Sequence, residues 1–152
     1  MLTDADRIRN LLGAYCERID AGDFDGVGAL FAHGSLAAGE DGPAFCRGAQ
    51  EVAAFYRAGT QLHDGSPRTK HVVADTVFEE PLDDGTVVVR SSYVVLQAAP
   101  GLALQPIIAG RYRDTFGRDG LDAWCFLERR FFVDLVGDLS HHLADPSIAQ
   151  QG

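Results

Sequence analysis

The sequence predicts a single α+β domain in which helices pack on one side of a curved antiparallel sheet. Apolar residues recur at helical spacing in the first part of the chain, and runs rich in Val, Ile, Phe and Tyr follow them. Only short turns separate these runs, and short connections between long strands indicate antiparallel neighbours. Helices followed by a meander of strands are typical of the α+β class.

Three helices are expected before the strands. The first begins at Thr3, which has the pattern of a capping box with Asp6, and ends at the next Ala-Gly pair. A short second helix, capped by Asp23 or Asp25, follows it, and a third covers about residues 49–56. The apolar face of each helix should point into the core, and these faces contain Ile8, Leu11, Leu12, Tyr15 and Ile19; Val27, Leu30 and Phe31; and Val52, Phe55 and Tyr56.

The strands are expected in the second half of the chain, after a short strand around residues 35–40. The long strands cover about residues 69–79, 86–98, 104–116 and 121–136. The chain after residue 136 is polar and contains Pro146, so we interpret it as a surface arm. The domain organisation is therefore one α+β domain, residues 1–136, and a C-terminal tail, residues 137–152.

Composition limits the classes of function. The 152 residues are 46% hydrophobic and 23% charged, which suits one soluble domain with its own core. A net charge of -9 argues against nucleic acid as a partner, because that affinity comes largely from Lys and Arg. No apolar run is long enough for a bilayer, and the N-terminus has no export signal, so no membrane partner is expected. Cys16, Cys46 and Cys125 lack metal-ligand spacing, and we expect reduced thiols in a cytoplasmic protein.

Asp20 is unusual for its place in the last turn of the first helix. Carbonyl groups at this end of a helix disfavour a negative charge by roughly 0.3–1 kcal/mol, so either the acid is a solvated turn residue or another group holds it. Five residues along a regular helix is about 140° of rotation, so Tyr15 and Asp20 share a cavity only if the last turn unwinds.

His71 lies near the start of the first long strand, on the face that alternation gives to Val73 and Val77. A strand histidine is often structural, but a histidine that a carboxylate orients is the usual general base at neutral pH. Asp20 and His71 are therefore the first candidates for an acid–base pair inside the domain.

The last strand contains a third candidate. Alternation places Leu127, Arg129 and Phe131 on one face and Phe126 and Glu128 on the other. Both faces are apolar, as expected of a strand covered by helices on one side and a partner subunit on the other. An arginine in this strand either holds a substrate anion or pairs locally with Glu128 or an aspartate.

Other motifs are weaker. The neighbouring pair His141-His142 is interpreted as part of the tail rather than a metal site, because adjacent side chains point apart and no further ligand lies at metal spacing. The sequence shows neither a nucleophile elbow nor a phosphate-binding glycine loop. Hydride and phosphoryl transfer are therefore disfavoured.

The order of the motifs resembles the SnoaL-like branch of the nuclear transport factor 2-like superfamily, from about Asp4 to Asp134. The motifs are YCERIDAGDFD (residues 15–25), LF (30–31), Gly48, RTKH (68–71), GRYRD (110–114) and Trp124 followed by Arg129. This resemblance implies a cone-shaped curved sheet that encloses a pocket and is closed by three N-terminal helices. It also implies chemistry that needs no metal or organic cofactor.

The resemblance also implies site residues. Scytalone dehydratase, bile-acid 7α-dehydratase and hexachlorocyclohexane dehydrochlorinase use an Asp at the end of the first helix and a His on the first long strand, which Asp20 and His71 match. Tyr15 matches the tyrosine of the bile-acid enzyme, and Arg129 resembles the pocket arginine of that enzyme and of the dehydrochlorinase. The second pocket histidine of scytalone dehydratase is missing, because residues 110–112 read Gly-Arg-Tyr at that position.

The expected function is a lyase or isomerase reaction, most simply a dehydration, on an apolar polycyclic or aromatic molecule. His71 would remove a proton, Asp20 would orient it, and Tyr15 and Arg129 would serve the developing negative charge. The expected pocket walls are Phe31, Phe55, Val73, Tyr93, Tyr112, Leu127 and Phe131. Two alternatives remain, a non-catalytic small-molecule-binding protein and the small structural subunit of a ring-hydroxylating dioxygenase. In each case a homo-oligomer or assembly is expected, for the enzyme a dimer or trimer.

Overall fold

A computed structural model describes residues 1–145, which form three helices and one six-stranded sheet. The helices are α1 (Asp4–Asp20), α2 (Phe24–Leu30) and α3 (Gly48–Gly59). The strands are β1 (Ser35–Ala38), β2 (Cys46–Arg47), β3 (Thr69–Phe78), β4 (Val87–Ala99), β5 (Leu102–Arg118) and β6 (Trp124–Val136). The helices and long strands expected from the sequence are all present, with bounds that differ by a few residues.

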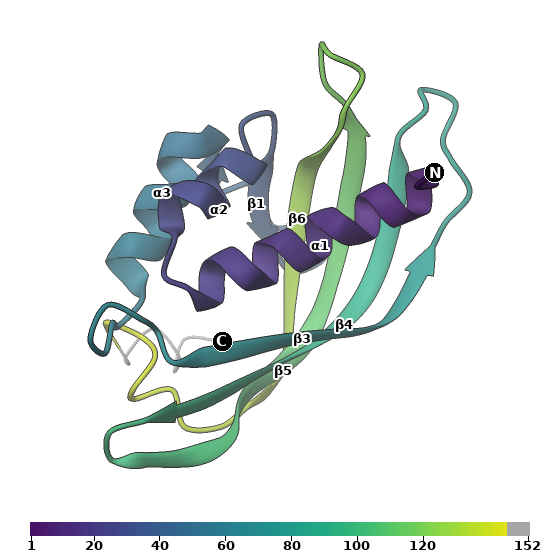
Figure 1. The fold of residues 1–152 in the computed structure, drawn as a ribbon. Helices are drawn as coiled ribbons and strands as arrows, with labels where there is room; N and C mark the ends of the chain where they lie inside the picture. Colours follow the sequence, from purple (N-terminus) through teal and green to yellow (C-terminus); the bar gives the residue numbers. More distant parts are fainter. Residues whose placement is uncertain (146–152) are drawn as a thin grey trace.

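The sheet is curved and unclosed, and its strand order is β2-β1-β6-β5-β4-β3. The meander from β3 to β6 is antiparallel as expected. β1, however, pairs in parallel with β6, with Ser35 opposite Glu128, so the expectation of a wholly antiparallel sheet is wrong at this edge. Figure 1 shows α1 lying across the concave side of the sheet, with α2 and α3 packed beside each other near one of its ends.

The starts of the first two helices follow local hydrogen-bonding rules. The expected capping box is present, because Thr3 Oγ1 accepts from the Asp6 N–H at 3.2 Å and Asp6 Oδ2 accepts from the Thr3 N–H at 2.9 Å. α2 is capped by Asp23, whose Oδ1 accepts from the Gly26 N–H at 2.9 Å. Asp23 rather than Asp25 is therefore the cap.

Two register shifts change which side chains point inward. In β3 the pairing with β4 shifts between Ala74 and Val77, where Asp75 has a positive φ of 51°, and Val77 is consequently 44% exposed. In β6 the pairing with β5 shifts beside Phe116, so Phe126 and Arg129 are both buried. Simple alternation had put Val77 on the same face as His71, and Phe126 and Arg129 on opposite faces, and both predictions are wrong.

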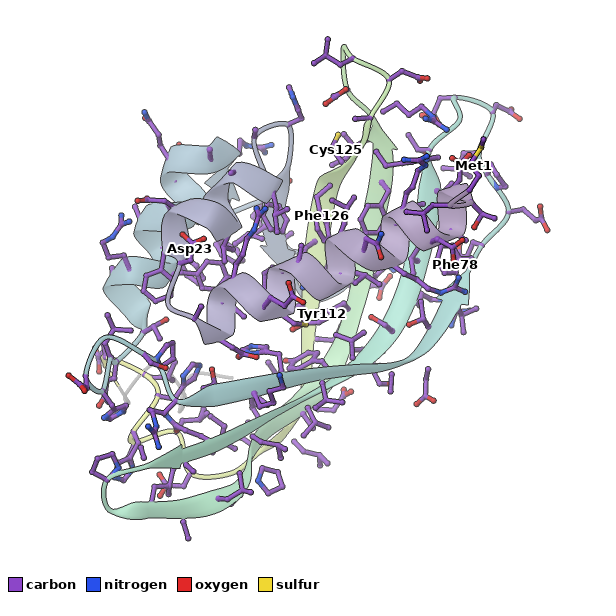
Figure 2. All side chains as sticks on the ribbon, viewed as in Figure 1. Met1, Asp23, Phe78, Tyr112, Cys125 and Phe126 are labelled. Atoms are coloured by element: carbon purple, nitrogen blue, oxygen red, sulfur yellow. The ribbon has the colours of Figure 1, made fainter. Side chains whose placement is uncertain are left out.

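The buried apolar side chains form two clusters. The first cluster joins the helices to β1 and to the neighbouring ends of β4, β5 and β6, and includes Tyr15, Phe31 and Phe126. The second lies farther along the sheet and consists of Tyr93, Val95, Leu102, Ile107, Tyr112 and Leu139. Figure 2 shows Tyr112 and Phe126 on the face of the sheet that α1 crosses. Edge-to-face contact of the Tyr15 and Tyr112 rings, 6.3 Å between centroids, connects the two clusters.

The segment after β6, residues 137–145 as far as the structure describes it, turns back onto the domain. Leu139 is only 7% exposed and belongs to the second cluster. Leu143 forms a β-bridge with Thr60, and the Ala144 N–H donates to the Gly59 carbonyl at 3.0 Å. This part of the expected surface arm is therefore packed against α3 and the loop after it, and Pro146 lies outside the described residues. No helix within residues 1–145 is long and apolar enough to cross a bilayer.

Candidate active site

Asp20 and His71 are in direct contact. The Nδ1 atom of His71 lies 2.6 Å from Asp20 Oδ1, and the His71 backbone N–H donates to Asp20 Oδ2 at 2.9 Å. The hydroxyl of Thr69 donates to Asp20 Oδ1, also at 2.9 Å. The two side chains are 13% and 8% exposed for Asp20 and His71 respectively. Asp20 is therefore stable in the last turn of α1 because residues of β3 form three hydrogen bonds with its carboxylate.

This contact determines the tautomer of a neutral His71. The ionised carboxylate of Asp20 can only accept hydrogen bonds, so it is the acceptor in its bonds with the His71 backbone N–H, the Thr69 hydroxyl and Nδ1 of His71. The hydrogen of a neutral His71 ring is then on Nδ1, and Nε2 keeps its lone pair. Within residues 1–145, Nε2 makes no hydrogen bond, so the basic nitrogen is available to a ligand.

The ionised form of Asp20 is the stable one in the fold. Burial raises the pKa of the carboxyl group, but the hydrogen bonds and charge of His71, with the bond from Thr69, outweigh it and leave the pKa below its ordinary value.

Tyr15 reaches the same region from the interior of α1. Its ring meets the His71 ring edge-to-face at 6.2 Å, and its hydroxyl oxygen lies 2.6 Å from that of Tyr56 on α3. The last turn of α1 does not unwind, because α1 remains helical to Asp20. Tyr15 and Asp20 each contact the His71 ring without such unwinding.

The tyrosines of this region are held in their neutral form. Burial raises the pKa of Tyr15, Tyr56 and Tyr112, and raises that of Tyr93 to about 12. Phenol groups with such pKa values remain protonated at neutral pH. They therefore serve as hydrogen-bond donors rather than as bases.

Arg129 is fully buried and is paired with Asp114, one of the local partners that the sequence left open. Its Nε and Nη2 atoms each donate to a different oxygen of Asp114 at 2.8 Å, and both side chains are 0% exposed. The guanidinium carbon lies 3.7 Å from the centre of the Tyr112 ring and 4.2 Å from that of Tyr15. Of the three guanidinium nitrogens of Arg129, only Nη1 lacks a hydrogen-bond partner within the described residues.

The predicted pocket walls divide into two groups. Val73, Tyr93, Tyr112 and Phe131 gather in or against the second cluster, with the Tyr93 and Tyr112 rings stacked at 4.3 Å, while Phe31 is buried in the first.

Phe55 and Leu127 lie elsewhere than the sequence analysis predicted. Phe55 is 44% exposed and packs on Phe45, because Val52 and Ala53 occupy the buried face of α3. Leu127 lies at the β6 register shift and packs against Gly117, on the side opposite the buried Phe116. Neither residue is among those that line the groove beside His71.

His71 opens onto a groove between α1 and β3. The groove has a volume of about 480 Å³ and is lined on the helix side by Leu12, Gly13 and Cys16 and on the strand side by His71 and Val73, among others. Its walls are mainly apolar. His71, whose side chain is 8% exposed, is one of the residues that line the groove.

Two residues near the site were not predicted as site residues. Tyr56 was expected to face inward, but nothing in the sequence indicated that its hydroxyl would meet that of Tyr15. His142 was assigned to the tail, yet it is close enough to His71 and Asp20 for their charges to influence its pKa. No group of three or more His, Cys, Asp or Glu side chains with metal-binding geometry occurs in residues 1–145.

The fold and sequence are similar to known proteins. The model of the SnoaL-like domain matches residues 1–130, whereas no curated protein matches the chain. The structure of ActVI-ORFA from Streptomyces coelicolor is similar with a TM-score of 0.68 and 18% identity, covering 84% of this chain and 95% of that chain.

Two structures from Novosphingobium aromaticivorans are also similar. One is a protein proposed to be a scytalone dehydratase, with a TM-score of 0.67, 16% identity and coverage of 89% of this chain and 87% of that one. The other is the beta subunit of a proposed aromatic-ring-hydroxylating dioxygenase, with a TM-score of 0.65, 20% identity and coverage of 86% and 88%. At these identities the similarity establishes the fold alone. Because the family model matches residues 1–130 of the 152-residue chain, the chain belongs to the SnoaL-like family.

Proposed function

We propose that this protein is a cofactor-independent enzyme of the lyase or isomerase type that acts on an apolar, polycyclic or aromatic small molecule. The observation that carries this proposal is the hydrogen bonding of Asp20, which fixes His71 with a free Nε2 beside an apolar groove. A structural neighbour described as a proposed scytalone dehydratase gives further support, although at the level of fold.

In the proposed reaction, Nε2 of neutral His71 removes a proton from a carbon next to a carbonyl or a leaving group. The electron pair of the broken C–H bond forms an enolate, or forms a double bond as the leaving group departs. The imidazolium that results is stabilised by Asp20, and its proton returns to the substrate or leaves with the departing hydroxyl as water. General base catalysis of this kind contributes on the order of 10²–10⁴ in rate.

Tyr15 and Tyr56 are suited to stabilise the negative charge that develops on a substrate oxygen. One hydroxyl of this pair donates to the other across 2.6 Å, so one hydroxyl hydrogen remains for an oxygen of the substrate. Arg129 acts through Tyr15, because its guanidinium stacks on the ring and Asp114 occupies two of its nitrogens. We therefore infer that Arg129 mainly positions and polarises Tyr15, with Nη1 as its remaining donor.

Deuterium exchange tests the proton transfer without knowledge of the natural substrate. A panel of ring ketones, including 1-tetralone, is incubated with the protein in D₂O, and exchange next to the carbonyl is followed by NMR. The wild type should accelerate exchange of at least one ketone, and His71→Gln should lower that acceleration by about 10²–10⁴. Asp20→Asn should lower it less, because Nε2 is retained.

His33→Gln is the matched control, because His33 is exposed in the turn after α2. This variant should catalyse exchange of the ketone at the wild-type rate. Equal exchange by His71→Gln and the wild type would reject the proposal. A protein that binds ketones without any exchange would be a binding protein instead, and one that purifies with a large oxygenase chain would be a structural subunit.

We also infer that copies of the chain associate through the outer face of the sheet, as a dimer or trimer. Large apolar side chains of β5 and β6 are exposed by 54–71%, namely Leu104, Val133, Leu135 and Val136. Light scattering should report a mass above that of one chain, and Leu135→Lys should shift it toward the monomer. A monomeric wild type at micromolar concentration would contradict this inference.

A further inference from the structure

The C-terminal segment brings a second imidazole into the interior. Nδ1 of His142 is buried, and no described residue supplies it with a hydrogen bond. Proteins rarely leave a buried polar atom without a partner, because the lost hydration is not replaced. An orphaned nitrogen at the edge of a candidate site is therefore an indication of where a ligand binds.

Hydrogen bonds on both sides of His142 hold its backbone in place. Its N–H donates to the Leu139 carbonyl at 3.0 Å, and its carbonyl accepts from the Gln61 N–H at 2.8 Å. The preceding carbonyl, that of His141, accepts from Nε2 of His63 at 2.7 Å and from Nε2 of the fully buried Gln97 at 2.9 Å. The imidazole is thus carried on a fixed piece of chain rather than on a free end.

Apolar residues anchor the segment on either side of His142. Leu139 and Leu143, on either side of His142 in sequence, belong to or pack against the second cluster. Burial lowers the pKa of His142 to about 4, with a smaller effect in the same direction from His71 and an opposing one from Asp20. At neutral pH the ring is therefore uncharged, with one N–H donor and one acceptor nitrogen.

We propose that His142 is a substrate-binding residue whose Nδ1 forms a hydrogen bond with an oxygen of the ligand. The ligand class that fits is an apolar ring compound with a carbonyl or hydroxyl group, whose rings pack on the second cluster and whose oxygen meets His142. This inference rests on the proposed function, since the carbon next to that oxygen is the one that His71 would deprotonate. The segment 137–145 thereby forms a wall of the site.

Binding of 1-tetralone and of tetralin, its hydrocarbon counterpart, tests the proposal. Dissociation constants are measured by protein NMR for the wild type, for His142→Phe and for the matched control His141→Phe. His141 lies on the same segment, but its ring contacts Ser140 and the neighbourhood of Gly101 instead. His142→Phe should weaken 1-tetralone binding about five- to tenfold, the effect of one hydrogen bond, and leave tetralin binding unchanged.

His142→Asn supplies a rescue, because its side-chain amide places a polar atom near the position of Nδ1 and should restore ketone binding to within about threefold of the wild type. His142→Phe should melt no lower than the wild type, since it removes an unpaired buried nitrogen. Should it fold poorly, His142→Leu is compared with His142→Asn in the same assay.

Failure of this inference can be distinguished from failure of the proposed function. Unchanged ketone binding by His142→Phe, equal losses for ketone and hydrocarbon, or no binding of 1-tetralone by the wild type would overturn the role of His142. Those results leave the exchange test of His71 untouched. Conversely, a His142→Phe variant that loses ketone selectivity would support the binding role even if His71→Gln exchanged normally.

Discussion

Two buried carboxylates, Asp20 and Asp114, have different consequences for their partners. Asp20 uses one oxygen on Nδ1 of His71 and leaves the other ring nitrogen without a protein partner in the described chain. Asp114 binds two nitrogens of Arg129 with both side chains fully buried. The first arrangement prepares a base, whereas the second immobilises a cation between aromatic rings.

The Asp20–His71 contact predicts a pH dependence of stability. The pKa of Asp20 is lowered in the fold, so ionisation of this group stabilises the fold above its unfolded pKa of about 3.9, and the contribution is lost as the pH falls through the folded value. The difference in unfolding free energy between the wild type and Asp20→Asn should therefore be larger at pH 5.5 than at pH 2.5. Urea unfolding at the two pH values measures it, and an equal difference would count against an ionised Asp20.

The Asp114–Arg129 pair predicts strong coupling between two substitutions. Asp114→Ala leaves a buried guanidinium without its carboxylate and should lower the unfolding free energy by about 3–5 kcal/mol. The double variant Asp114→Leu with Arg129→Met removes both charges and should recover most of that loss, as measured by denaturant unfolding. Additive losses would show that the two side chains act independently.

At the scale of elements, close approach of backbones determines how the helices sit. Gly28 on α2 faces α3 so closely that a Cβ atom would lie 2.3 Å from the Ala49 carbonyl oxygen. Gly13 on α1 has open space at the same position. The two helical glycines therefore have opposite requirements.

Alanine at each position tests this difference. Gly28→Ala should force α2 and α3 apart and destabilise the protein by about 1–3 kcal/mol, a typical overpacking cost. Gly13→Ala should stabilise it by roughly 0.5–1 kcal/mol, the usual gain inside a helix. The melting temperatures of both variants measure this difference. A shift of both melting temperatures in the same direction would contradict the close packing of α2 on α3.

The sequence predicted the elements well because their signals are local. The capping box at Thr3 and the alternation within β4 needed no knowledge of the rest of the chain. The errors arose where distant chain segments decide the outcome. The bulge at Asp75, the shift beside Phe116 and the parallel pairing of β1 with β6 all depend on partners that local patterns do not reveal.

The same distinction applies to the candidate site. The residue pattern singled out Asp20 and His71 as candidates, and the family resemblance matched them to a known pair, although α1 and β3 are far apart in sequence. Phe55 was misplaced because its helix buries Val52 and Ala53 instead. His142 was missed because a polar tail gives no sign that Leu139 will anchor it in a core.

Considered as a whole, the molecule has a second core that is incomplete without its C-terminal segment. Leu139, 7% exposed, is the member of that core supplied from beyond β6. Leu139→Ala should therefore lower the unfolding free energy by about 2–4 kcal/mol. Leu121→Ala, at a side chain that is 90% exposed, should change it by less than about 0.5 kcal/mol. Similar melting temperatures for the two variants would show that the second core does not need the segment.

The parallel pairing of β1 with β6 also constrains the order in which the chain acquires its structure. Ser35 meets Glu128, so this edge remains unformed on the ribosome until nearly all of the polypeptide has emerged. Contacts between such distant residues slow folding, because a large loop must close before they contribute. The N-terminal helices and β1 therefore emerge before β6, their last packing partner, is made. A truncated translation product would leave exposed the surfaces that β6 covers in the complete fold.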